Sequence, residues 1–389
     1  MRILLVTQLS KNDEGDIVYH GVEYHRMTKP HAVLERHFPE YILTATNMQE
    51  FNLDSEAKID FVTKLVKEQD LVLFNREIPP NCIELLNEIC VPYGLDLDDY
   101  WYLPGHHELR EHYDNFNIPE KTENSIRNAH FVIVTTPILA EKVQPFNKNV
   151  YVIENGIDSQ DEVWQPRKVE SPRMRFGFTQ GSTHFEDIKT LFSSTKRALK
   201  DWEFRTKGQI VLCGFQEPKE GDIARQWRKV NVPQGIECLM TDSHSLLPNL
   251  NHVIALQNFQ PFNDLNEPYR RILAKPVLEF AKVYDEFDVS VAPLKVNTFN
   301  SCKSELKMLE AGFKGCAIML SHVKPYTLLA TNKNSFDLCK NTFREIAVKL
   351  IKNPNLVKDS ASQLREDVDR YDLNKLVSKR NDLYKKYKK

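Results

Sequence analysis

Short apolar runs alternate with helix-like stretches along the first 165 residues. Residues 2–8 (RILLVTQ) form a continuous apolar run of high strand propensity. Similar runs recur at 41–45, 70–75, 92–97, 130–136 and 149–154, and helical patterns such as 60–68 and 81–89 separate several of them. Buried strands that alternate with helices are typical of a parallel sheet covered on both faces. The pattern predicts an α/β domain whose ligands bind beyond the carboxyl ends of the strands, in the loops after Val6, Phe74, Leu95 and Val134.

The alternation stops in a polar stretch with scattered prolines, residues 155–172, and then restarts. Strand-like runs follow at 174–179, 209–215, 253–259, 289–294 and 316–321, and the chain from 343 onward has helical periodicity. We therefore expect two tandem doubly wound, Rossmann-like domains that face a cleft. The first domain spans 1–165 and the second spans 166–372, and a helical tail, 373–389, packs back on the first domain.

The composition is that of an ordinary globular protein. Hydrophobic residues make up 41% of the 389 residues and charged residues 27%, which argues against disorder. No apolar run reaches the roughly eighteen residues of a membrane span, and the first residues read as a buried strand rather than as a signal peptide. The seven cysteines form no CxxC pair, so we expect neither a disulfide framework nor a zinc knuckle. These features favour a cytoplasmic location.

The net charge of −2 conceals an asymmetry between the two parts of the chain. Residues 1–165 hold 14 Lys and Arg against 28 Asp and Glu, whereas residues 166–389 hold 38 against 26. A basic second domain suits a phosphate-bearing ligand, and an acidic first domain disfavours a polyanion. The alternative is that the opposite charges only help the two domains to dock.

The most informative segment is 289–326, in which a strand leads through a polar loop into a helix. Asn300 or Ser301 is expected to cap this helix, which places Lys303 in its first turn. Unpaired backbone N–H groups beside a lysine make a phosphate site, and a carboxylate two turns further can accept hydrogen bonds from a ribose. Lys303, Lys307 and Glu310 share this face, and Leu306, Leu309 and Phe313 form the buried stripe. The alternative is a solvated charged face.

A second segment, 175–188, ends a strand in Gly181 and Ser182. Thr183 and Glu186 have the spacing of a capping box, which predicts a helix start directly after the first strand of the second domain.

Loops of the first domain hold further candidates. Gly21 lets the backbone approach a ligand, and Arg26 lies one turn into a helix that continues to His37 with a kink or restart at Pro30. Arg76 follows a strand, and it either reaches the cleft or forms an ion pair with Glu77 or Asp98.

The segment 94–107 is rich in residues of metal-ligand type. These are Asp96, Asp98, Asp99, His106 and His107. Carboxylates and imidazoles do bind metals, but the spacing matches no ligand motif, so we expect no metal site.

The segments 300–322 and 176–188 resemble the donor site of glycosyltransferases with two Rossmann-like domains (GT-B), specifically the glycogen-synthase-like group. Glu310 matches the second of two glutamates that the group places eight residues apart and that binds the nucleotide ribose. Cys302 stands where the group has the first glutamate, which contacts the donor sugar. His184 and Asp187 fit a Gly-Ser-x-x-His pattern with a following aspartate, where the group's second domain meets the diphosphate.

For this chain the resemblance implies three sets of residues. The donor-binding residues are Gly181, Ser182, His184, Asn300, Ser304, Lys307 and Glu310. The catalytic residues are Lys303, Asp98 and Asp99. The residues on the acceptor side of the cleft are Gly21, Arg26, Arg76 and His106.

We therefore expect a hexosyl- or pentosyltransferase that moves a sugar from a nucleotide diphosphate sugar to a hydroxyl of a glycan or other small acceptor. The resemblance implies retention at the anomeric carbon, no cofactor and no essential metal. The sequence has no P-loop motif, which argues against an ATPase, and no GxGxxG motif after the first strand, which argues against a nicotinamide dehydrogenase. It also has no GxSxG motif, which argues against an α/β-hydrolase.

Two alternatives stay open. One is a glycosyltransferase of the same fold that acts on hydroxymethylated DNA bases, and the other is a non-catalytic protein that binds sugar nucleotides or glycans. The acidic first domain disfavours DNA, because phosphate contacts dominate its binding. The basic tail, 379–389, either docks phosphates or is a solvated helix.

Overall fold

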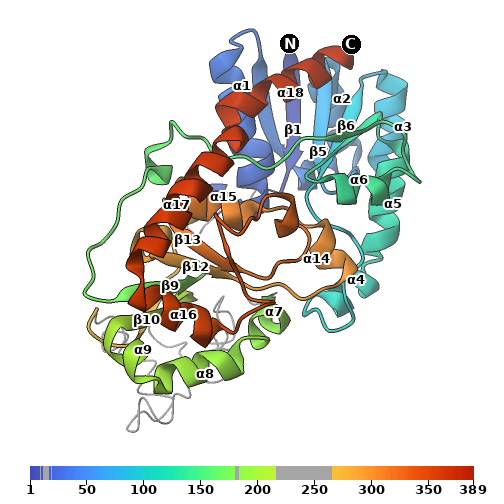
Figure 1. Ribbon diagram of the computed structural model, residues 1–389. Coiled ribbons are helices and arrows are strands. Elements are labelled where there is room, and N and C mark those ends of the chain that lie inside the picture. The colour runs from blue at the N-terminus through green and yellow to red at the C-terminus, as the bar shows by residue number, and fades with distance from the viewer. Residues whose placement is uncertain (9, 12–16, 19, 180–183, 216–264) are drawn as a thin grey trace, which may run out of the picture. The chain divides into compact units, whose positions relative to one another are not determined.

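The computed structural model describes the chain except residues 9, 12–16, 19, 180–183 and 216–264 (Figure 1). The chain divides into two compact units. Unit 1 comprises Met1–Gln160, Asn297–Leu306 and Arg370–Lys389, and unit 2 comprises Asp161–Val296 and Lys307–Asp369. The segment 297–306 therefore belongs to unit 1, whereas the sequence-based division placed it in the second domain.

Unit 1 is built on a six-stranded parallel sheet of order β4-β1-β5-β6-β7-β8. Its strands are β1 (Arg2–Thr7), β4 (Ile42–Asn47), β5 (Leu71–Asn75), β6 (Tyr93–Leu97), β7 (Phe131–Val134) and β8 (Val150–Val152). Each strand lies on one of the apolar runs of the sequence. Val6 pairs with Phe74, and Asn75 pairs with Asp96, so β1, β5 and β6 end at the same edge of the sheet.

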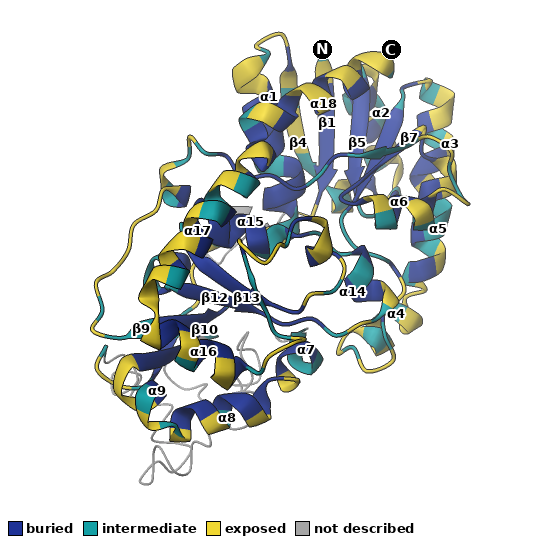
Figure 2. Ribbon diagram, in the orientation of Figure 1, coloured by how far each residue is buried: buried dark blue, intermediate teal, exposed yellow. Residues whose placement is uncertain are grey.

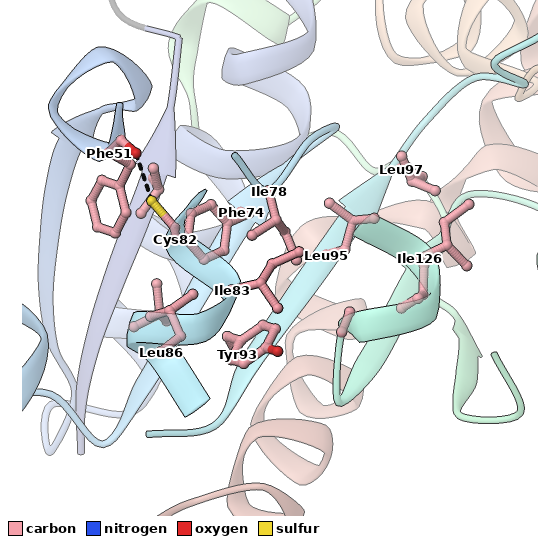
Figure 3. Packing of buried hydrophobic residues seen from close by; sticks show 14 of the residues in the cluster. Phe51, Phe74, Ile78, Cys82, Ile83, Leu86, Tyr93, Leu95, Leu97 and Ile126 are labelled. Carbon is pink, nitrogen blue, oxygen red and sulfur yellow. Dashed lines mark hydrogen bonds between the residues drawn. The ribbon is translucent and has the colours of Figure 1, made fainter. Parts of the chain in front are cut away.

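Successive residues of these strands pack on opposite faces of the sheet. Val6, Phe74 and Leu95 face a cluster formed with α2 (Glu56–Lys67), α3 (Pro80–Ile89) and α5 (Ile118–Asn128). Figure 3 shows this packing, including the thiol of Cys82, which donates to the Phe51 carbonyl at 2.6 Å.

The other face of the unit 1 sheet is covered by helices from the two ends of the chain. Leu5 and Leu73 pack there with Leu34 of α1 (Lys29–His37) and Tyr384 of α18 (Leu373–Lys386). The helix expected from after Gly21 to His37 begins as the π-helical segment η1 (Glu23–Thr28) and continues as α1, and Pro30, the expected kink or restart point, lies in the first turn of α1.

Unit 2 repeats the architecture with a six-stranded parallel sheet of order β11-β10-β9-β12-β13-β14. Its strands are β9 (Met174–Phe178), β10 (Gly208–Phe215), β11 (Tyr269–Leu273), β12 (Val289–Ala292), β13 (Ala317–Leu320) and β14 (Phe336–Asp337). Gly177 is required in β9, because a Cβ there would lie 2.1 Å from the Phe287 ring. The run 253–259, expected as a strand, lies outside the described residues.

Helices cover the unit 2 sheet, and the central strands of both sheets are buried along most of their length (Figure 2), whereas the edge strands β4, β8 and β14 are partly exposed. These helices are α7 (Phe185–Lys189), α8 (Phe192–Lys200), α9 (Trp202–Lys207), α15 (Leu306–Phe313), α16 (Phe343–Lys352) and α17 (Pro354–Val368). The shorter elements are β2 (Ser10–Lys11), β3 (Ile17–Val18), η2 (Met48–Phe51), α4 (Arg110–Asn115), α6 (Pro137–Val143), η3 (Glu162–Trp164), η7 (Val277–Glu286), α14 (Thr298–Cys302), η8 (Tyr326–Leu328) and η9 (Asp369–Tyr371). Across the described part of the chain, no helix has the length and apolarity needed to cross a membrane.

Candidate functional site

In unit 2 a buried carboxylate lies on α15. Oε2 of Glu310 accepts hydrogen bonds from the Tyr284 hydroxyl at 2.6 Å and from Nζ of Lys307 at 2.9 Å. Glu310 is 2% exposed, whereas the Lys307 side chain is 23% exposed. Burial, followed by the negative charge of Glu310, raises the pKa of Tyr284 well above its usual value. The Glu310 carboxylate is therefore fixed in position, and the Lys307 side chain beside it is partly exposed to solvent.

Lys307 is held from a second side by an aromatic ring. Its Nζ lies 5.0 Å from the centroid of the Phe280 ring, a distance at which a cation is attracted to the ring face. The hydrogen bond between Lys307 and Glu310 confirms that these two share a helix face, but Lys303, expected on the same face, lies before α15 begins. Tyr284 and Phe280 were missed by sequence reasoning, because neither belongs to a recognisable motif and both lie in η7, outside the helix that they support.

The loops after β9 and β12 are tied together by Asp187. Its Oδ2 shares a hydrogen bond with Nδ1 of His184 at 2.8 Å, and its Oδ1 accepts from the backbone N–H of Lys295 at 2.8 Å. The ammonium of Lys295 pairs with Glu186 at 2.8 Å, and this hydrogen bond lowers the pKa of Glu186. Lys295, three residues after the end of β12, was not among the site residues predicted from the sequence.

Three residues expected beside His184 cannot be placed. Gly181, Ser182 and Thr183 lie outside the described residues. The described helix begins after His184, which makes no side-chain cap.

The structure corrects the expected position of Lys303. The helix after β12 begins at Thr298, because the Asn297 side chain accepts from the backbone N–H of Asn300 at 2.8 Å. It ends at Cys302, so Lys303 is a C-cap residue and not part of a first turn, and α15 begins only at Leu306. The positive end of a helix dipole is therefore not available to Lys303 from α14.

Within unit 1, Lys303 is paired with Asp99. Its Nζ lies 3.3 Å from both carboxylate oxygens of Asp99 and 4.4 Å from the Phe299 ring centroid. Nearby on the chain, Oγ of Ser304 accepts from the Asn155 side chain at 2.7 Å. Two expected catalytic residues are thus brought together, while Ser304 is engaged within the unit.

Cys302 lies in the hydrophobic core of unit 1. It is fully buried, and burial raises the pKa of its thiol to about 11. Glu305, three residues further along the chain, is 3% exposed, and its Oε2 has no hydrogen-bond partner among the described residues. Burial raises the pKa of Glu305.

Arg26 is not open to a ligand. Its guanidinium donates to Asp96 at 2.7 and 3.2 Å, to the Ile153 carbonyl and to the Asn155 side chain, and the residue is 1% exposed. Arg380 of α18 also donates to Asp96, at 3.3 Å. The acceptor-side role expected for Arg26 is therefore replaced by a structural one, because two arginines neutralise a carboxylate that the sheet buries.

The other first-domain candidates are more accessible. Arg76 pairs with Asp98 at 3.1 Å, which matches one of the two expected interpretations. Burial opposes ionisation of Asp98, but Arg76 outweighs it and lowers the pKa of this carboxyl. Gly21 and His106 are exposed. No three His, Cys, Asp or Glu side chains of the described residues are grouped so that they could hold a metal ion.

A pocket of about 480 Å³ lies at the carboxyl edge of the unit 1 sheet, between the loops after β1, β4 and β5 and the N-terminus of α3. Sequence reasoning pointed to this edge but selected none of the residues that line it. Elsewhere at this edge, oxygens of Thr7, Glu23 and Asn75 are buried without a partner among the described residues.

Comparison with known proteins places the fold. No protein-family model matches the sequence, and no curated protein does. Solved structures do match over nearly the whole chain. Sucrose-phosphate synthase from Thermosynechococcus elongatus is 11% identical with a TM-score of 0.66, and 99% of each chain is covered. HepE from Anabaena, solved with UDP, is 13% identical with a TM-score of 0.61, and covers 99% of this chain and 100% of its own.

An alpha-glucosyltransferase solved with UDP is also similar, at 13% identity and a TM-score of 0.58, with 99% of this chain and 100% of that chain covered. These neighbours share two parallel α/β sheets with this chain. The chain therefore has the GT-B glycosyltransferase fold, which confirms the predicted fold class.

Proposed function

We propose that the protein is a glycosyltransferase that moves a sugar from a nucleoside diphosphate sugar to an acceptor hydroxyl. The observation that carries the proposal is the Glu310–Lys307 pair in unit 2, held by Tyr284 on a GT-B fold. A carboxylate accepts hydrogen bonds from a ribose diol, and a partly exposed ammonium neutralises a phosphate. These are the two charged groups that a nucleoside diphosphate requires.

The roles of the other candidate residues are those that the sequence resemblance implies. His184, oriented by Asp187, would face the diphosphate together with Gly181, Ser182 and Asn300. Lys303, with Asp98 and Asp99, would act on the reacting groups. A lysine that meets the charge that grows on the leaving diphosphate lowers the barrier more than it strengthens binding. Gly21, Arg76 and His106 would border the acceptor, and the proposal requires no metal and no cofactor.

Uridine diphosphate is the first nucleotide to test, since HepE and the alpha-glucosyltransferase are each described in complex with it. Binding of UDP to the folded chain alone should raise the melting temperature with nucleotide concentration. A panel of UDP-, GDP- and ADP-sugars, each followed by a donor hydrolysis assay, then identifies the base and sugar. Proton NMR of the product tests the retention that the sequence resemblance implies.

A second candidate is a sugar-nucleotide-binding protein that catalyses no transfer. Cys302 favours it, because a thiol in a hydrophobic core stands where the glycogen-synthase-like group has a glutamate. Nucleotide binding without hydrolysis or transfer for any sugar of the panel would support this candidate against the first. Absence of nucleotide binding would contradict both.

A further inference from the structure

The outer strand of the unit 1 sheet, β4, presents an open edge. Among the described residues, β4 pairs with β1 alone, in an unbroken parallel register over its six residues. The N–H of Ile42 donates to the Met1 carbonyl at 2.9 Å, so Ile42 and every second residue after it direct their backbone groups toward β1. Leu43 and Ala45 therefore direct theirs away from the sheet, where no described residue bonds them.

The other edge strands of the two six-stranded sheets are protected against pairing. Natural proteins avoid edge-to-edge association with edge strands that are short, charged, bulged or interrupted by proline. β8 and β14 have only three and two residues, and β11 carries Arg270 and Arg271. By contrast, β4 has six residues and neither a charge, a proline nor a bulge. Among the edge strands of the described sheets, β4 alone lacks such protection.

The side chains of β4 are accessible as well, unlike most of those of β1 and β5 (Figure 2). Ile42 is 54% exposed, and Thr44 and Ala45 are also exposed. Ile42 and Thr44 project on the face of the sheet that α2 covers, because Thr44 pairs with Leu4, which packs in the same cluster as α2. An uncharged strand with unpaired backbone groups and accessible side chains is a template for a further strand.

The edge is complementary to itself. If two copies of β4 pair antiparallel about a two-fold axis at Thr44, Leu43 of one copy lies opposite Ala45 of the other, and the two exchange both backbone hydrogen bonds. Thr44 then faces Thr44 of the second copy, which is a favourable cross-strand pair. Ile42 faces Thr46, and no pair brings like charges together. The edge therefore fits a second copy of the chain without repulsion.

We propose that β4 is a dimer interface at which a second copy of this chain continues the sheet. Two six-stranded sheets would join into one of twelve strands. Four hydrogen bonds between the copies correspond to about 400–800 Å² of buried surface, at roughly one bond per 100–200 Å². This is less than the roughly 1,200 Å² of a stable complex, so the dimer is reversible and forms as the protein concentration rises.

The proposed dimer leaves the transfer site of each copy independent. Because the two strands run antiparallel, the carboxyl edges of the two unit 1 sheets lie at opposite ends of the joined sheet. The proposal therefore goes beyond the proposed function and does not depend on it.

Sedimentation velocity of the full chain over a concentration series tests the proposal. We expect monomer at about 1 µM and a growing dimer fraction at about 100 µM and above, as for an interface of this size. Ala45→Pro removes an N–H that faces away from β1, which a sheet edge tolerates. Each dimer loses two hydrogen bonds, so the dimer Kd should rise about tenfold or more. The melting temperature of the dilute monomer should stay unchanged.

A second variant tests the same interface by charge. Thr44→Lys places two ammonium groups opposite each other at the two-fold axis, and like charges in that position are unfavourable. The dimer Kd should again rise about tenfold or more, the transfer rate per chain should equal that of the parent, and the dilute monomer should melt as the parent does.

Two further variants are controls. Gln144→Lys adds the same charge at an exposed position at the end of α6, which packs beside β8 at the opposite edge of the sheet, and should leave the dimer intact. Thr46→Pro removes an N–H that faces β1 and should lower the melting temperature of the monomer. A dimer that Ala45→Pro and Thr44→Lys weaken and Gln144→Lys does not would support the proposal. A parent that stays monomeric throughout the series overturns it, as does a dimer that both β4 variants leave intact.

Discussion

Lys303 and Asp99 lie 204 residues apart in the sequence and form one ion pair within unit 1, with the ammonium 3.3 Å from both carboxylate oxygens. The segment 297–306 belongs to that unit and brings the lysine to the loop that follows β6. Both side chains are partly exposed, at 19% and 33%. The pair therefore contributes little to the free energy of unfolding, on the order of 0–1 kcal/mol. Replacing either residue should consequently affect a functional role more than the stability of the fold.

We expect Lys303→Ala to lower the transfer rate by about a hundredfold, the scale for loss of one positioned group that stabilises developing charge. Donor affinity should fall much less, and the free energy of unfolding should change by no more than about 1 kcal/mol. Initial-rate kinetics, calorimetry with UDP and urea unfolding measure the three quantities. Lys148→Ala, at an exposed position of unit 1, is the control. Intact transfer, or rate and affinity that fall in equal proportion, would exclude Lys303 from catalysis.

The sheets were predictable because their signal is local. A strand covered on both faces must be apolar at nearly every position, so runs such as 2–8 and 130–136 stand out without knowledge of their neighbours. The same signal does not depend on how the strands are ordered. Many different apolar sequences satisfy this local requirement, and chains only 11–13% identical to this one share its fold.

The site residues were harder to predict because their surroundings come from distant segments. Arg26 lies in η1, in a polar stretch of the sequence, but Asp96 and Arg380, which help to bury it, lie 70 and 354 residues away along the chain. The start of the helix after β12 was misplaced for a local reason. Asn297, Asn300 and Ser301 are all good caps, and propensity does not distinguish one long helix from a short α14 followed by a break.

We expect Glu310→Gln to weaken UDP binding by about 1–3 kcal/mol, the cost of losing a charged hydrogen-bond acceptor. Lys307→Ala should weaken it as well, because the exposed part of that side chain carries the positive charge toward solvent. Calorimetry with UDP measures both, and Lys282→Ala is a control on an exposed ion pair with Glu279. Unchanged UDP affinity in Glu310→Gln would remove Glu310 from the site, and a lower melting temperature alone would assign it a structural role.

A third prediction concerns the buried triad of Asp96, Arg26 and Arg380. Arg380 is 3% exposed and Asp96 is fully buried, and loss of one partner of a buried pair costs about 3–5 kcal/mol. Arg26 still pairs with Asp96 in Arg380→Leu, so we expect a loss near the lower value in urea unfolding. Lys385 is also on α18 and forms an exposed ion pair with Glu40. Lys385→Ala breaks that pair and should lower the free energy of unfolding by less than about 1 kcal/mol. Equal losses in the two variants would show that the C-terminal helix is not held by the triad.

The last prediction concerns pH and His31, which α1 buries against α18. Nε2 of His31 lies 2.8 Å from the Tyr384 hydroxyl, and Arg380 also donates to that hydroxyl. Burial first, and then the charge of Arg380, holds the pKa of His31 well below its usual value. In the unfolded chain this histidine takes up a proton as the pH falls through about 6.5, while in the folded chain it stays neutral, so stability falls with decreasing pH from that point. The slope from this one residue is at most about 1.4 kcal/mol per pH unit.

His31→Gln should therefore lose less stability than the parent between pH 7.5 and 5.5, measured by urea unfolding at each pH. His112→Gln, at an exposed position, gives the baseline for the substitution itself. A parent and a His31→Gln variant with the same pH slope would mean that His31 is protonated in the folded protein.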